Sequence, residues 1–168
     1  LMDLITQTGI EICEGQFMDM QFENSDKVLE SEYIEMIRLK TAVLLGACFK
    51  AGGILGEASD NDLNLLYTIG VDLGIGFQIM DDVLDTFSDN PKVGKIKGGD
   101  IIANKKTILL INALDQANTS QAQELNKWLS AENFNPTEKV KAVIDIFNQL
   151  DIESQAKAKM NTYYNLAI

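Results

Sequence analysis

Residues 61–87 read NDLNLLYTIGVDLGIGFQIMDDVLDTF, and this stretch decides the fold. It contains about 27 residues and no proline, so at 1.5 Å per residue it would form a helix roughly 40 Å long. Ser59 and Asp60, which precede it, are suited to cap its first turn. Most of its circumference is apolar, and we therefore expect a central helix that other helices cover.

Apolar residues at helical spacing predict further helices on both sides of this stretch. We expect them at residues 1–22, at about 31–56, at about 104–118, after a capping box Ser120-x-x-Gln123, and after Asn135-Pro136, with a loop at residues 89–100. No segment alternates with a period of two. The sequence therefore predicts an all-α protein, a helical bundle in which residues 1–168 belong to one domain.

Composition excludes several classes of protein. The formal net charge of −11 argues against a nucleic-acid partner, because a phosphate backbone must be met by a surplus of Lys and Arg. The lack of histidine excludes the usual catalytic triads and most zinc sites. We found no uncharged apolar run of ~18 residues and so expect no stable membrane insertion. Cys13 and Cys48 lie in apolar segments, which predicts buried, reduced thiols and a cytoplasmic location.

Carboxylates gather on one side of the long predicted helix. At 100° per residue, Gln78, Asp81, Asp82 and Asp85 fall within an arc of about 100°. Three like charges so close repel one another and favour a cation, and Mg²⁺ is the ion that carboxylates and substrate phosphates commonly share. A solvated acidic face is the alternative explanation. Such a face is usually wider and also carries Lys and Glu.

Two glycines project onto the same stripe one and two turns earlier. Because Gly70 and Gly74 have no side chain, we expect them to let a ligand approach the backbone beside the carboxylates.

Four motifs in this order resemble those of the trans-isoprenyl diphosphate synthases. They are Gly15-Gln16-x-x-Asp19, Lys40-Thr41, Phe77-Gln78-x-x-Asp81-Asp82-x-x-Asp85, and Gly94-Lys95 with Gly98-Gly99-Asp100 and Lys105 beyond. The third motif is similar to the second aspartate-rich motif of that family. The resemblance covers roughly residues 10 to 115. It implies the helical bundle of the isoprenoid synthases and the head-to-tail condensation of isopentenyl diphosphate with an allylic diphosphate, in a homodimer that requires Mg²⁺.

The resemblance also implies a role for each matched residue. Asp81, Asp82 and Asp85 would hold Mg²⁺, with Asp81 a direct ligand and Asp85 acting through water. Lys40, Lys95 and Lys105 would bind the allylic diphosphate, Thr41 and Gln78 would stabilise the allylic cation, and Gln16 and Asp19 would line the same cavity. Taken alone, each lysine could equally be a solvated surface residue, and Thr41 a threonine inside a helix.

The family's first aspartate motif is not found in this sequence, and Arg38 is its only arginine. We therefore expect a C-terminal portion of the domain that is inactive alone. Two alternatives remain open: a non-catalytic regulatory subunit of a heteromeric prenyl synthase, and a class I terpene cyclase. Such subunits often lose the aspartates that are intact here, and the cyclases build their second metal motif from Asn, Ser or Thr, and Glu.

Overall fold

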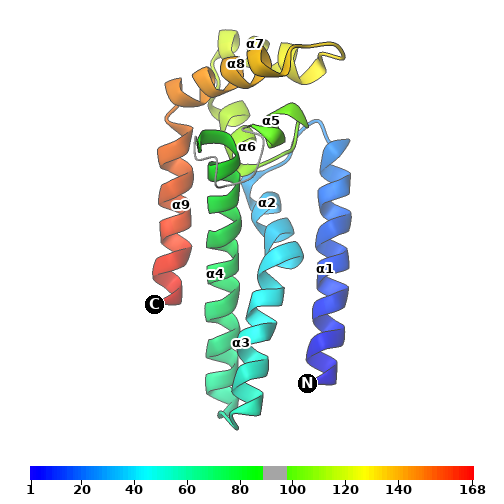
Figure 1. Cartoon of the computed structure of the whole chain (residues 1–168), viewed down its shortest axis with the longest axis vertical. Coiled ribbons are helices and arrows are strands. Elements are labelled where there is room, and N and C mark those ends of the chain that lie inside the picture. The colour runs from blue at the N-terminus through cyan, green and yellow to red at the C-terminus, as the bar shows by residue number, and fades with distance from the viewer. Residues whose placement is uncertain (89–97) are drawn as a thin grey trace. The chain divides into compact units, whose positions relative to one another are not determined.

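The structure is a computed structural model and describes residues 1–88 and 98–168. Every regular element in these two ranges is a helix (Figure 1). In chain order they are α1 (Met2–Glu23), α2 (Glu30–Ile37), η1 (Arg38–Ala42), α3 (Val43–Leu55), α4 (Asp60–Phe87), α5 (Gly99–Ile102), α6 (Ile108–Gln116), α7 (Thr119–Ser130), α8 (Pro136–Gln149) and α9 (Ile152–Ala167). The predicted all-α class is confirmed.

The helices form two compact units. The first contains residues 1–79 and 158–168, and the second contains residues 80–157. The boundary falls inside α4 and inside α9, so each of these helices contributes to both units. Each unit is described by itself below, and the single domain expected from the sequence stays a prediction.

In the first unit, α1, α3 and α4 run side by side (Figure 1). Glycines let α3 and α4 approach closely: a Cβ on Gly70 would lie 2.6 Å from Gly46 Cα, and a Cβ on Gly74 would lie 2.5 Å from Ala42 Cα. The expectation that Gly70 and Gly74 leave room for a ligand was therefore wrong. Another helix fills that space, because two glycine-bearing helices gain van der Waals contact by packing backbone against backbone.

In the second unit, α8 packs against α5, α6 and α7. Its start is the one that the sequence predicted, since Asn135 Oδ1 accepts the N–H groups of Thr137 and Glu138 at 3.0 and 3.4 Å, and Pro136 occupies the first helical position. Apolar side chains of these helices form the core of the unit, including the fully buried Ile108, Leu109, Leu125 and Phe147.

Some helix limits differ from the prediction. Helix α6 begins at Ile108, four residues late, because Asn104 is left-handed with φ 56° and Thr107 is the cap. The capping box before α7 consists of Asn118 and Gln121. The pair expected from the sequence, Ser120 and Gln123, has the same spacing, and the extended backbone at residue 118 decides between them.

The last predicted helix is two helices. Leu150 ends α8 and Asp151 adopts a left-handed conformation with φ 54°, after which α9 begins at Ile152. No glycine or proline marks this break in the sequence, and the signals that end most helices therefore did not reveal it.

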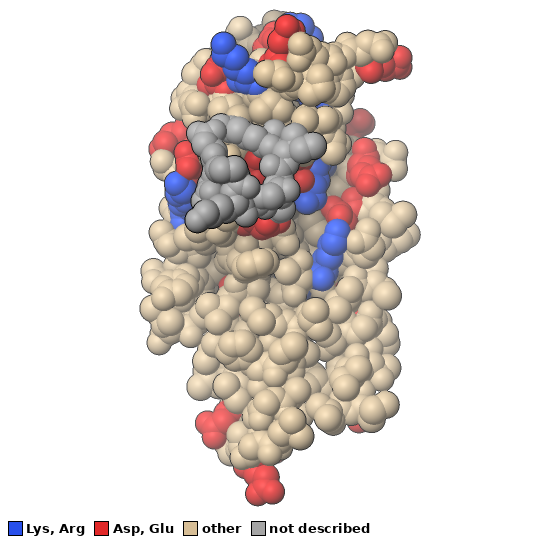
Figure 2. Space-filling model, viewed as in Figure 1, with Lys and Arg blue, Asp and Glu red and all other residues tan. Residues whose placement is uncertain are grey.

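The surface is apolar in places. On the face shown in Figure 2, the helices of the first unit carry few charged side chains. Exposed apolar residues of α1 include Ile5, Ile10 and Phe17. Cys13 and Cys48 are free and exposed, so the predicted burial of these thiols was wrong. Both lie in apolar segments, but on the outward faces of α1 and α3.

Helix α4 is long and apolar enough to cross a membrane by length and composition alone, a criterion that the core helix of a soluble protein also meets. It is the only such helix among the residues that the structure describes. Its last two turns carry three aspartates, whose charges would be costly in a lipid interior. The lack of stable membrane insertion stays a prediction.

Candidate functional site

A short π-helical segment interrupts the helix predicted at residues 31–56. In η1 the N–H of Val43 donates to the carbonyl of Arg38, five residues earlier, which gives one widened turn. This turn carries Lys40 and Thr41. Single π turns inside α-helices are rare and are frequent at functional sites, because they rotate side chains away from the regular helical positions.

Helix α1 contacts the backbone of this widened turn at Gly15. A Cβ on Gly15 would lie 2.8 Å from Lys40 Cα and 2.9 Å from the carbonyl carbon of Leu39. Only glycine permits this approach without displacing one of the two helices. Gly15 therefore sets the separation between the helix that carries Asp19 and the turn that carries Lys40.

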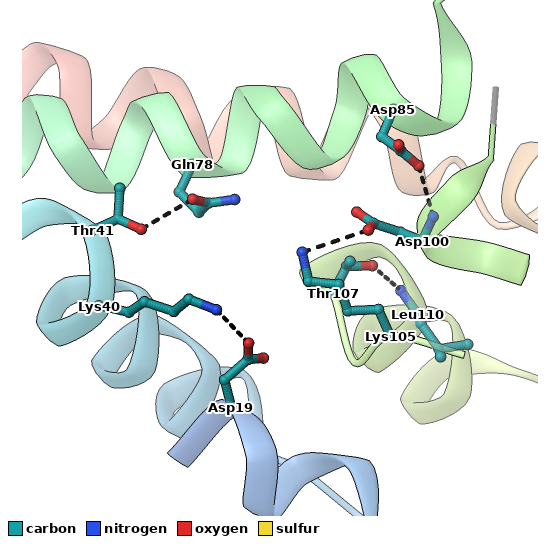
Figure 3. Close-up of polar contacts among 9 residues, drawn as sticks. All are labelled: Asp19, Lys40, Thr41, Gln78, Asp85, Asp100, Lys105, Thr107 and Leu110. Carbon is teal, nitrogen blue, oxygen red and sulfur yellow. Dashed lines mark hydrogen bonds and ion pairs between the residues drawn. The ribbon is translucent and has the colours of Figure 1, made fainter. Parts of the chain in front are cut away.

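The first unit brings four predicted residues together as two polar pairs (Figure 3). Lys40 Nζ lies 2.5 Å from Asp19 Oδ2, in an ion pair whose side chains remain 34% and 21% exposed. The hydroxyl of Thr41 donates to Gln78 Oε1 at 3.1 Å. A lysine ammonium has three N–H donors, so Lys40 can hold Asp19 and still donate to a phosphate. The lone pairs of the Thr41 oxygen remain able to face an electron-poor carbon.

Gln16 does not join this group. It is exposed on α1, and within the described ranges its side chain makes no hydrogen bond. On a helix, residues 16 and 19 share a face only approximately, and Asp19 is the one that is turned toward η1. Lys95, which the sequence also singled out, lies outside the described residues.

The only arginine of the chain stands at the start of η1. Arg38 donates from Nε and Nη2 to the two carboxylate oxygens of Glu35, each at 2.7 Å. These hydrogen bonds lower the pKa of Glu35. The guanidinium is therefore held by the carboxylate of Glu35, one turn earlier, in a bidentate pair.

The three aspartates of the DDxxD motif occupy the end of α4. Asp82 is 1% exposed and Asp85 is 7% exposed, whereas Asp81 is half-buried. A solvated acidic face would leave all three in water, so burial argues against that explanation for Asp82 and Asp85. Burying a carboxylate costs several kcal/mol unless it is paired. In the described ranges, every buried side-chain nitrogen or oxygen atom has a hydrogen-bond partner.

In the second unit, Asp85 holds residues 98–100 (Figure 3). Its Oδ2 accepts the N–H of Asp100 at 3.0 Å, and its carbonyl accepts the N–H of Gly98 at 2.8 Å. The carboxylate of Asp100 in turn forms an ion pair with Lys105, Nζ to Oδ1 3.5 Å. Asp85, Asp100 and Lys105 therefore form one connected group.

Sequence analysis did not include Asp100 among the site residues. Its position in Gly98-Gly99-Asp100 was noted only as part of a motif. The two preceding glycines are the signal that could have identified it. A Cβ on Gly99 would lie 3.3 Å from Asp85 Oδ1, a tight contact, so glycine lets the chain pass close to the carboxylate.

The donor set at the end of α4 suits Mg²⁺. All three candidate ligands supply carboxylate oxygen, the donor that this hard cation prefers, and Mg²⁺ usually takes one or two carboxylates and completes its shell with water and phosphate. Among the described residues, no three His, Cys, Asp or Glu side chains converge as a closed metal site. Asp81 is the most exposed of the three aspartates, which favours it as a direct ligand.

Comparisons with known proteins show which family this chain resembles. The sequence model of the polyprenyl synthetase family matches residues 1–147. The geranylgeranyl diphosphate synthase of Methanosarcina mazei is 47% identical over 115 residues, which are 68% of this chain and 36% of that protein. The enzyme of the same name from Sulfolobus acidocaldarius is 36% identical over 166 residues, 99% of this chain and 50% of that protein.

A solved structure is similar as well. A crystal structure of a geranylgeranyl pyrophosphate synthase matches with a TM-score of 0.92 at 36% identity, over 98% of this chain and 51% of that one. The predicted isoprenoid synthase type of bundle is thereby confirmed. The chain spans about half the length, or less, of the curated relatives that it matches.

Proposed function

Because this chain belongs to the polyprenyl synthetase family, we propose that the whole protein joins isopentenyl diphosphate head to tail to an allylic diphosphate. The observation that carries the proposal is the aspartate motif at the end of α4, in which Asp82 and Asp85 are nearly buried. The group that links Asp85 to Lys105 adds a cation beside these anions. Carboxylates for a divalent metal and lysines for phosphate oxygens are the groups that recognition of a diphosphate requires.

In the proposed reaction, the bond between the allylic carbon and the diphosphate oxygen breaks, and its electron pair leaves with pyrophosphate. The double bond of isopentenyl diphosphate attacks the allylic cation and leaves a cationic carbon in the isopentenyl unit. The carbon next to that centre then loses a proton, which forms the new double bond. Lys40, Lys95 and Lys105 bind the leaving diphosphate, with Asp19 holding Lys40 in place and Gln16 lining the cavity. The oxygens of Thr41 and Gln78 face the cationic carbons, and the hydrogen bond between them fixes their orientation.

Asp81, Asp82 and Asp85 would hold Mg²⁺, with Asp81 as a direct ligand and Asp85 acting through water. The metal, when bound, would neutralise charge that develops on the leaving diphosphate, where cations stabilise the transition state by several kcal/mol. Asp85 also holds residues 98–100, because its Oδ2 and its carbonyl accept the N–H groups of Asp100 and Gly98, and so fixes the carboxylate with which Lys105 pairs.

We propose a homodimeric, cytoplasmic enzyme without a nucleic-acid partner for the whole protein. The net charge of −11 supports the last point, because a polyanion would be repelled. The homodimer rests on the resemblance to the family, and the cytoplasmic location rests on the two free cysteines.

A chimera tests the proposal. This chain would replace the segment that it matches in the Sulfolobus acidocaldarius relative, and the purified chimera would be assayed with labelled isopentenyl diphosphate and an allylic diphosphate. We expect a longer prenyl diphosphate that forms with Mg²⁺ and is abolished by EDTA. A cyclised hydrocarbon would instead indicate a terpene cyclase, and a folded chimera without product would indicate a non-catalytic subunit.

The chain by itself should make no prenyl diphosphate. The resemblance implies that the metal ions are held between two aspartate motifs, and the sequence contains one of them. The same labelled assay, run on the pure 168-residue chain at saturating Mg²⁺, should give no product above the protein-free blank. Measurable condensation by the pure chain would show that one motif suffices.

Lys105→Ala should weaken use of the allylic substrate selectively. In the chimera we expect its KM for the allylic diphosphate to rise at least about tenfold, since a charge-assisted hydrogen bond contributes about 1.5–3 kcal/mol. The KM for isopentenyl diphosphate should change less than about threefold. Lys141→Ala, an exposed lysine on α8, is the control. Equal losses for both substrates would contradict the role given to Lys105.

A further inference from the structure

Lys139 on α8 is buried completely, with 0% of its surface exposed. Its Nζ donates to Asn104 Oδ1 at 2.5 Å and to the carbonyl of Ile102 at 3.3 Å, and it lies 4.2 Å from the centre of the Phe134 ring. In residues 1–88 and 98–168, no carboxylate lies within ion-pair distance of it. Burial lowers the pKa of Lys139.

Retention of this lysine needs a reason. Burying an ammonium group costs several kcal/mol, and a methionine would fill a similar volume without that cost. The three contacts of Lys139 all belong to the second unit, and two of them fall on the end of α5 and on the turn that follows it. Lys139 can therefore determine the position of that turn.

Asn104 is the residue of the turn that Lys139 holds. Its backbone is left-handed, with φ 56°, a conformation that asparagine tolerates better than most residues. Its side chain connects two helices: Oδ1 accepts from Lys139, and Nδ2 donates to the carbonyl of Leu129 on α7 at 2.9 Å. Both ends of the amide are therefore fixed, and the left-handed backbone is held from two sides.

The residue after Asn104 is Lys105. Its N–H donates to the carbonyl of Asp100 at 2.9 Å, and its Nζ pairs with the carboxylate of Asp100. Asp100 is in turn bound by Asp85. If residue 104 relaxed to a right-handed conformation, the chain would leave the turn in another direction and carry Lys105 with it.

We propose that Lys139 is a positioning residue, which holds Asn104 left-handed and thereby keeps Lys105 beside Asp100 and Asp85. This inference rests on the proposed function, because Lys105 matters only if it binds a diphosphate. Lys139 itself need not touch the ligand. Its effect on binding should therefore pass entirely through Lys105.

The first test uses the full chain without any ligand. Lys139→Met keeps most of the length of the side chain and removes its donors, and Lys141→Met makes the same change at an exposed position of α8. We expect hydrogen exchange at the N–H groups of Asn104 and Lys105 to become at least about tenfold faster in the first variant only. Unchanged exchange in a folded Lys139→Met chain would overturn the proposal.

The second test measures binding of pyrophosphate by the chain in the presence of Mg²⁺, by calorimetry. Lys139→Met and Lys105→Met should each weaken binding about tenfold, and the double variant should be no weaker than Lys105→Met alone. Losses that multiply in the double variant would mean that Lys139 acts independently of Lys105, which contradicts positioning.

Failure of the Lys139→Met chain to fold and failure of the wild-type chain to bind pyrophosphate each have their own consequence. If Lys139→Met does not fold, Asn104→Gly takes its place, because it removes the amide that Lys139 holds and glycine adds no backbone strain of its own. It should loosen Lys105 in the same exchange experiment, and unchanged exchange there would also overturn the inference. If the wild-type chain binds no pyrophosphate, the proposed function loses its support, while the exchange rates still decide whether Lys139 positions the turn.

Discussion

Asp81→Asn is expected to lower kcat of prenyl transfer by about 100-fold or more, which corresponds to roughly 2.7 kcal/mol of transition-state stabilisation. The substitution keeps the size of the side chain and the helix but removes an anionic oxygen ligand. The deficit should be greatest when charge has built up on the leaving diphosphate, so the KM for the allylic substrate should change less than kcat. The measurement is the labelled condensation assay on the chimera at saturating Mg²⁺.

Asp72→Asn is the matched control for this experiment. It makes the same chemical change on the same helix, nine residues earlier and outside the DDxxD motif, and should leave kcat within about twofold of the parent. Both variants should melt within a few degrees of the unmodified protein. A folded Asp81→Asn chimera with kcat within about threefold of the parent would mean that Asp81 is not a catalytic metal ligand.

Gly15→Ala is expected to lower the melting temperature of the chain by several degrees. The added Cβ would lie 2.8 Å from Lys40 Cα and 2.9 Å from the carbonyl carbon of Leu39, and backbone atoms cannot rotate away as a side chain can. Overpacking of this kind costs about 1–3 kcal/mol, and each kcal/mol shifts the melting temperature of a protein of this size by about 2–4 °C. Circular dichroism during heating measures the change.

Gly9→Ala separates this packing effect from helix propensity. Gly9 lies on the same helix, and a Cβ there would meet nothing within 4 Å, so this variant should gain about 0.5–1 kcal/mol, as alanine does over glycine inside a helix. Gly15→Ala should also weaken binding of pyrophosphate, because α1 must move away from η1 and take Asp19 from Lys40. If both variants are stabilised equally, the close contact at Gly15 does not exist in solution.

The helices themselves followed from local patterns. The start of α4 at Ser59-Asp60 and the start of α8 at Asn135-Pro136 depend on residues within three positions of each other, whose hydrogen bonds form inside one turn. The end of α8 could not be predicted from local patterns, because the left-handed residue there is Asp151 and not a glycine. The capping box of α7 was also missed, since two pairs of residues had the right spacing.

The sequence by itself determined the helical class, the family, and the presence of three aspartates on the last two turns of one helix, because residues three or four apart on a helix lie on one side whatever surrounds them. Only the tertiary structure decided which distant residues meet. Lys40 pairs with Asp19 across 21 positions, Thr41 with Gln78 across 37, and Lys139 with Asn104 across 35. It also decided that Gly70 and Gly74 face another helix and that Asp82 and Asp85 are buried. Contacts over such separations depend on how whole helices pack, and the periodicity of one segment contains no information about the helix that covers it.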